Sequence, residues 1–174
     1  MKTQSKRRIK PHSLLIALLL FLAFGALFGG GSLITQPDGS GFGMPVSILA
    51  SSPFSDFTLP GLILFVLFGF GSLVAVYGLI AQPRWAWTEP LTRPLHMHWS
   101  LVAAAIIGFG QMIWIVVEVV MIRGVLWLHP TFFLIGLAIL LLAFMDKRMV
   151  DKVGLSREQK QITRQASSTE GTKE

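Results

Sequence analysis

The sequence predicts an all-α, polytopic membrane protein built as a four-helix transmembrane bundle. Hydrophobic residues make up 52% of the 174-residue chain and charged residues only 14%. The charges are also segregated, so that four long stretches carry one charged residue between them. Each stretch could cross the roughly 30 Å hydrocarbon core, which needs about 20 residues. A soluble bundle is the alternative, but so small a chain has too little polar surface to cover four buried helices.

The charge-poor stretches define the elements in order. We expect spans at about residues 13–35, 60–82, 100–122 and 128–146; the third contains Glu118, and the only other charge is Asp146 at the end of the fourth. A basic tail of residues 1–12 precedes this membrane domain, residues 13–149. Residues 150–174 form a second tail, whose Ser-, Thr-, Glu- and Lys-rich end cannot bury a core and is expected to be largely disordered.

The first stretch has two interpretations. Its basic start, apolar run and small residues also fit a cleaved signal peptide. The apolar run continues through Ser32, Leu33 and Ile34, which is longer than a typical signal peptide allows, and favours retention as a span.

Basic residues predict the orientation. The loop 37–59 contains Asp38 and Asp56 but no Lys or Arg, whereas both tails are basic and the second loop carries Arg84 and Arg93. By the positive-inside rule, the 37–59 loop lies outside and both termini lie in the cytoplasm. Arg123, near the third loop, is a mild exception.

The outer loop is too apolar for a freely solvated linker. Glycines and prolines mark turns in it, yet Val46, Leu49 and Phe57 are large and apolar. We expect the loop to fold back as a cap on the bundle, with Asp56 or Thr58 capping the second span.

Small residues are candidates for helix contacts inside the membrane. They occur four residues apart in the first span (Gly25 and Gly29), in the second (Gly71 and Ala75) and in the third (Ala104 and Gly108). Together these pairs favour a compact bundle.

The run PDGSGFGMPVSILASSPFSDFTLPGLILFVLFGFGSL, residues 37–73, resembles a pattern in small uncharacterised bacterial four-span membrane proteins. In these an acidic, glycine-rich outer loop leads through a segment like SPFSDFTLPG into the second helix, and the third helix carries a polar residue or two. The resemblance implies a bacterial plasma membrane protein and a four-helix bundle, but no activity or catalytic residue.

Two polar residues in the third span are the candidate site. Gln111 and Glu118 are seven residues apart, which places them on nearly the same helical face, with Trp114 between them. Polar groups facing lipid are costly, so this face should turn inward. Tyr77 of the second span is a candidate neighbour of Gln111.

Each polar residue has a structural and a functional interpretation. Gln111 can act as a hydrogen-bonding contact between helices, the favoured interpretation. Glu118 can pair structurally or can serve as a ligand or proton site. Arg123 is about 140° around the helix from Glu118, so His129, across a tight turn, is the easier partner.

The remaining motifs exclude several classes. The chain has no cysteine, so it is neither a disulfide framework nor a CxxC redox protein. His96 and His98 lie in a loop without suitable co-ligands, no histidine lies in the interior of a span because His129 is at the start of the fourth, and no metal, haem or other cofactor is expected. The basic tails predict contact with the lipid bilayer rather than nucleic acid. Other membrane proteins, or a second copy of the chain, are the candidate protein partners.

Three functions remain open. A non-enzymatic accessory or scaffolding bundle is favoured. A small proton- or cation-coupled carrier or channel could use Glu118 and Gln111, but the two halves do not repeat as carriers usually do. A lipid-modifying enzyme could use Glu118 as acid or base, but would need a second titratable group nearby. The deciding feature is whether Gln111 and Glu118 face a cavity or a packed neighbour.

Overall fold

A computed structural model of the chain describes residues 11–83 and 97–146. Within these residues the chain forms helices and no strand. Four helices are long and apolar enough to cross a membrane, which confirms the all-α bundle. The predictions for the two tails, Arg84, Arg93 and His96 lie outside the described residues.

The four spanning helices follow the apolar stretches closely. They run over His12–Thr35, Thr58–Ala81, Trp99–Ile122 and Leu128–Asp146, starting at residues 12, 58, 99 and 128 where the sequence predicts 13, 60, 100 and 128. The first belongs to α1 (Pro11–Thr35) and the third is α5 (Trp99–Ile122). Arg123, in the left-handed conformation at φ 51°, ends α5 and starts the short turn into the fourth helix.

The second spanning helix is composite. It joins α2 (Thr58–Ile63), a π-helical segment η3 (Leu64–Phe70) and α3 (Gly71–Ala81) without a break. Gly61 and Gly69 both contact α1, although eight residues of regular α-helix would place them about 80° apart. In the wider π-helical turns each residue rotates the chain by less than the roughly 100° of an α-helix. This smaller rotation keeps both glycines on the face that contacts α1.

Glycine permits the closest approach of α1 to the second helix. A Cβ atom added to Gly30 would lie 2.6 Å from the carbonyl oxygen of Gly61 and 2.7 Å from the backbone nitrogen of Phe65. The expected pair Gly25 and Gly29 plays no such part, because a Cβ on Gly29 would meet nothing within 4 Å. The close contact with the second helix is made instead by Gly30, the next residue in the chain.

α5 packs between its two neighbours through further small residues. Gly78 of α3 lies against the ring of Trp99, and Gly108 lies against the backbone of Gly136 in the fourth helix. Ala104 is fully buried on the same face. The expected small pair in the third span therefore does form a helix contact.

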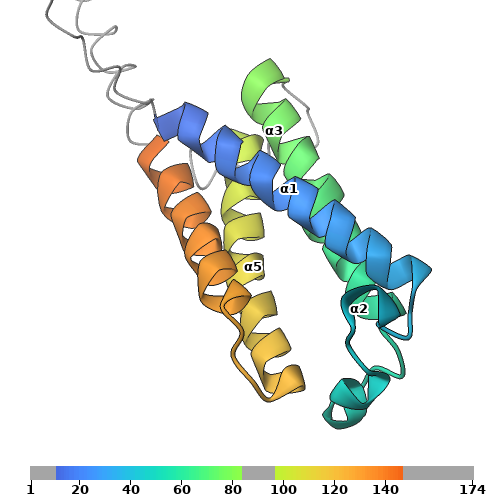
Figure 1. The fold of residues 1–174 in the computed structure, drawn as a ribbon. Coiled ribbons are helices and arrows are strands. Elements are labelled where there is room, and N and C mark those ends of the chain that lie inside the picture. The colour runs from blue at the N-terminus through green and yellow to red at the C-terminus, as the bar shows by residue number, and fades with distance from the viewer. Residues whose placement is uncertain (1–10, 84–96, 147–174) are drawn as a thin grey trace, which may run out of the picture.

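The first and fourth helices are joined at one end and separated at the other. His12 Nδ1 and Asp146 Oδ2 lie 2.7 Å apart, at the start of α1 and the end of the fourth helix. From this ion pair the two helices diverge toward the loop end of the bundle, as the blue and orange ribbons show (Figure 1). The result is a wedge between them that widens toward the loop 36–57.

The loop 36–57 folds back onto the wide end of the bundle, as expected. Its two short 3₁₀ helices are η1 (Ser40–Phe42) and η2 (Val46–Ser51). Leu49 and Phe57 are 2% and 5% exposed and form an apolar cluster with Leu33 of α1 and Met121 of α5. Asp56 Oδ1 accepts a hydrogen bond from the Thr58 backbone N–H at 2.8 Å, where the second helix begins.

Candidate functional site

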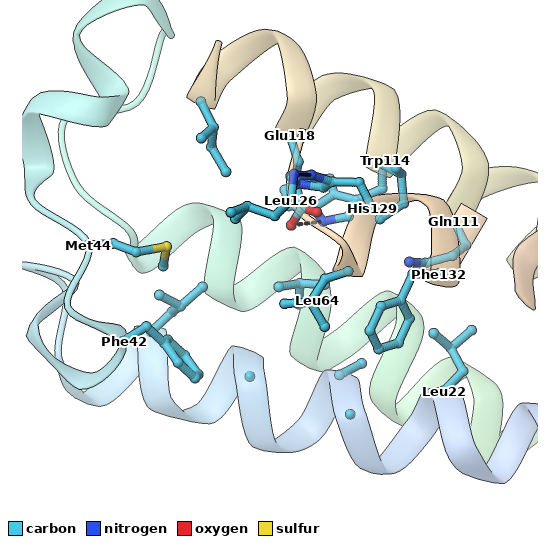
Figure 2. Close-up of a pocket in the computed structure, with 17 residues that line it drawn as sticks. Leu22, Phe42, Met44, Leu64, Gln111, Trp114, Glu118, Leu126, His129 and Phe132 are labelled. Atoms are coloured by element: carbon cyan, nitrogen blue, oxygen red, sulfur yellow. Dashed lines mark hydrogen bonds between the residues drawn. The ribbon is translucent and has the colours of Figure 1, made fainter. Parts of the chain in front are cut away.

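A cavity of about 380 Å³ lies in the wide part of the wedge, beneath the loop (Figure 2). Residues from α1, the loop, η3, α5 and the fourth helix line it. They are Leu22, Gly25, Ala26, Gly29, Leu33, Phe42, Met44, Leu64, Gln111, Trp114, Ile115, Glu118, Ile122, Leu126, Leu128, His129 and Phe132. The volume is within the roughly 300–1,000 Å³ typical of small-molecule sites.

One face of α5 supplies the polar wall. Gln111, Trp114 and Glu118 all line the cavity, as their spacing of three and four residues along a helix requires. The Trp114 indole Nε1–H donates a hydrogen bond to Glu118 Oε1 at 2.7 Å. Trp114 is thus a partner of Glu118, which orients one oxygen of the carboxyl group and leaves the other available.

Gln111 lies deeper in the cavity and is less satisfied. Its side chain is 2% exposed, and Oε1 has no hydrogen-bond partner within the described residues. The amide points into the space bordered by Phe132 and Leu22 (Figure 2). A buried polar atom without a partner costs about 1–3 kcal/mol, so Gln111 keeps unmet hydrogen-bonding capacity beside the cavity.

His129 completes the polar lining from the fourth helix. It is 5% exposed, and its Nδ1 accepts a hydrogen bond from the Leu126 backbone N–H at 2.8 Å. An Nδ1 that accepts carries no proton, so the ring is the Nε2–H tautomer and can donate from Nε2. Among the described contacts, the hydrogen bond to Glu118 comes from Trp114 rather than His129.

The opposite wall, on α1, is made of small and apolar residues. Gly25 and Gly29 leave open space there, and a Cβ on Gly25 would lie 3.6 Å from the Phe132 ring. Gly25 is exposed and Gly29 is partly exposed at the protein surface. The α1 side of the cavity therefore lacks side chains at these two positions.

Other titratable groups of the described chain are engaged elsewhere. Asp38 accepts hydrogen bonds from Ser40, and Asp56 accepts one from Thr58. His98 Nδ1 lies 2.8 Å from Ser100 Oγ at the start of α5. In residues 11–83 and 97–146 no group of three metal-binding side chains comes together.

Tyr77 was expected near Gln111, and this prediction is wrong. Its side chain is 55% exposed, because the inward face of α3 is formed by Ser72, Ala75, Val76 and Leu79. A phenol can remain at the membrane surface without a protein partner, which an isolated amide in hydrocarbon cannot.

The sequence predicted the polar stripe, the face of α5 that carries Gln111, Trp114 and Glu118, but two parts of the site were missed. The Trp114–Glu118 hydrogen bond follows an i, i+4 spacing that is visible in the sequence, so it could have been predicted. The role of Gly25 and Gly29 as a cavity wall has no sequence signal that distinguishes it from a helix contact.

The fold and the site together define the class: a four-span integral membrane bundle with an internal cavity that is apolar except for one amide, one carboxyl group and one imidazole. Comparison with protein-family models, with curated proteins and with solved structures found no match to the chain.

Proposed function

We propose that the chain is a non-enzymatic integral membrane protein that binds a lipid-soluble ligand in the cavity beneath the 36–57 loop. It would act as an accessory or scaffolding bundle whose ligand is held rather than transformed. As part of the same proposal, it is a small bacterial four-span protein of the plasma membrane with both termini in the cytoplasm.

The unpartnered amide of Gln111 supports this proposal most strongly. A residue that served only as a contact between helices would have both ends of its amide satisfied by a neighbouring helix. Gln111 instead lines the cavity, and its Oε1 has no partner among the described residues although the residue is only 2% exposed. An unpaired polar group that lowers the stability of the fold is typical of a binding site when it lies beside a cavity.

An enzyme is less well supported. Acid–base chemistry at Glu118 needs a second group that can exchange a proton with the substrate. His129 is the only other titratable residue among those lining the cavity, and its Nδ1 is already occupied by the Leu126 N–H. Asp38 and Asp56 do not line the cavity.

A channel or carrier is less well supported for a different reason. Beyond Gln111, toward the His12–Asp146 end, the described core is apolar apart from the hydroxyls of Ser72 and Ser100, with Leu15, Leu19, Ile139 and Ala143 fully buried. An ion or proton path needs a chain of polar groups or water across this layer. The cavity is therefore a pocket with one end closed.

Photolabelling tests the proposal. The probe is dodecanol carrying a diazirine in its chain, added to the purified chain in lipid nanodiscs. Wild type should show saturable labelling of peptides containing residues 22–33 and 111–118. In Gln111→Leu the probe concentration that gives half-maximal saturable labelling should rise about fivefold, which corresponds to the loss of one neutral hydrogen bond.

Ser72→Ala is the matched control. Ser72 Oγ is also buried and unpartnered, but Ser72 does not line the cavity, so labelling should be unchanged. Thermal unfolding of Gln111→Leu in the same nanodiscs should be no lower than wild type, because an unpartnered polar atom has been removed. Equal and non-saturable labelling of all three proteins would contradict a binding function.

A further inference from the structure

We propose that the ligand is a single-chain amphiphile whose head group donates hydrogen bonds, an alkyl ammonium or an alkyl alcohol, and that its tail passes over Gly25 and Gly29 into the surrounding lipid. This inference rests on the proposed function and specifies the ligand class and its route of entry.

The polar groups of the cavity set the chemistry of the head group. Gln111 Oε1 is an unpartnered acceptor, and Glu118 has one oxygen that does not receive the Trp114 hydrogen bond. The further donors among the lining side chains are the amide NH₂ of Gln111 and the Nε2–H of His129. A ligand that donates fits these two acceptors, and a hydroxyl group can also accept from His129.

The same groups disfavour an anionic head. No Lys or Arg is among the lining residues, and the carboxyl group of Glu118 would face a fatty acid carboxylate or a phosphate directly. An anion in this low-dielectric cavity would gain no cationic partner, and it would repel the Glu118 carboxyl group whenever that group is ionised. A cationic or neutral head avoids this cost.

The shape of the wedge sets the position of the tail. The ion pair of His12 and Asp146 holds α1 and the fourth helix together at one end, and they diverge toward the loop (Figure 1). The wall on α1 has no side chains at Gly25 and Gly29, and the opening of the cavity toward lipid is therefore placed at these two residues. A tail leaving the cavity here lies among the lipid chains, so it never has to cross the loop or the head-group layer.

The glycines are the feature that makes the entry testable. Gly29→Leu places a side chain where a Cβ meets nothing within 4 Å, so it fills the opening without displacing the backbone. Leucine is also a better helix former than glycine. Phe28→Leu is the matched control, since it introduces the same residue at the adjacent position, where the native ring is 75% exposed and does not line the cavity.

The experiment compares three diazirine probes with one chain and different heads: dodecylamine, dodecanol and dodecanoate. In nanodiscs at neutral pH, the amine and the alcohol should label cavity peptides saturably, and dodecanoate should bind about tenfold more weakly than either, the effect of one unpaired buried charge. Gly29→Leu should abolish saturable labelling by the amine and the alcohol, whereas Phe28→Leu should label like wild type. Thermal scans of both variants verify the fold.

Glu118→Gln distinguishes binding of the amine head group from binding of the alcohol head group. The amine should lose about tenfold in affinity with the charge-assisted contact, while the alcohol should change by no more than about twofold. Dodecanoate binding as well as the other probes, an unaffected amine in Glu118→Gln, or full labelling of Gly29→Leu would each overturn this inference and leave the proposed binding function standing. Loss of saturable labelling with all three probes would contradict the proposed function itself.

Discussion

Gln111 and Glu118 occupy one face of α5 but differ in how they are satisfied. Glu118 receives a hydrogen bond from Trp114 at 2.7 Å and is only partly buried, so the carboxyl group has both a partner and access to the cavity mouth. Gln111 is 2% exposed and its Oε1 is unpaired. The deeper residue therefore gains most from a ligand, although the shallower one is the charged type.

Asp38 provides a prediction at the residue scale, outside the membrane spans. It accepts hydrogen bonds from the Ser40 hydroxyl at 2.7 Å and the Ser40 backbone N–H at 3.0 Å. The hydroxyl contact first, and the backbone contact second, hold the pKa of Asp38 below its ordinary value of 3.8. Because the folded pKa is the lower one, the stabilisation is present above pH 3.8 and is lost as pH falls through the folded pKa.

NMR titration of carbon-labelled aspartate measures this directly. Asp38 should titrate below 3.8, and Ser40→Ala should move its midpoint up toward that value. Ser55→Ala, an exposed serine of the same loop, should leave the midpoint in place. A midpoint at or above 3.8 in wild type would show that the Asp38–Ser40 turn is not formed in solution.

Helical periodicity was enough to predict the polar stripe, because phase depends only on spacing. It could not predict the cavity that the stripe faces. That cavity depends on the angle between α1 and the fourth helix, which an ion pair between His12 and Asp146, 134 residues apart, helps to fix. Tyr77 shows the same limit, since its orientation depends on which face of α3 the neighbouring helices cover.

Within the single helix α1, two neighbouring glycines have different structural roles. Gly30 touches the backbone of the second helix, whereas Gly29 borders the cavity. The sequence pattern of four-residue spacing identified Gly25 and Gly29 as contacts, because small-residue patterns indicate that space is needed without indicating what fills it.

Single alanine substitutions should separate the two glycines. Gly30→Ala puts a Cβ 2.6 Å from the Gly61 carbonyl oxygen, a backbone atom that cannot rotate away, and should destabilise the bundle by about 1–3 kcal/mol. Gly29→Ala meets no atom and should not destabilise it, because alanine also favours the helix. Thermal unfolding in nanodiscs gives the comparison, and equal stability of the two variants would show that the α1–α2 contact is looser than described.

The π-helical segment gives a second prediction for an element. A π turn accommodates about one residue more than the α-helix around it. Deletion of Val66, which is 47% exposed in η3, would leave Gly61 and Gly69 seven α-helical steps apart, about 20° short of two full turns. The contact with α1 should survive, and the variant should fold.

Deletion of Val116 from α5 is the comparison. Val116 is similarly exposed, at 54%, but lies in regular α-helix, so its loss rotates Gln111 by about 100° relative to Glu118. This variant should lose stability and cavity labelling. If the Val66 deletion lowers stability more than the Val116 deletion does, the extra residue of the π-helical segment is required for folding, and this prediction is contradicted.

At the scale of the whole molecule, the orientation in the membrane is the outstanding prediction. The loop 37–59 carries aspartates and no basic residue, while the tails are basic. Reporter fusions after Ser47 and after Ala166 should report opposite sides of the membrane, with Ser47 outside. Reports from one side would contradict this topology.

The His12–Asp146 pair also bears on how the protein is made. During synthesis α1 is produced first, and its ionic partner exists only when the fourth helix has left the ribosome, 134 residues later. Until then α1 can already pack along the second spanning helix, but it lacks its contact with the fourth helix. The wall that the fourth helix gives to the cavity, with His129 and Phe132, is therefore the last to be added.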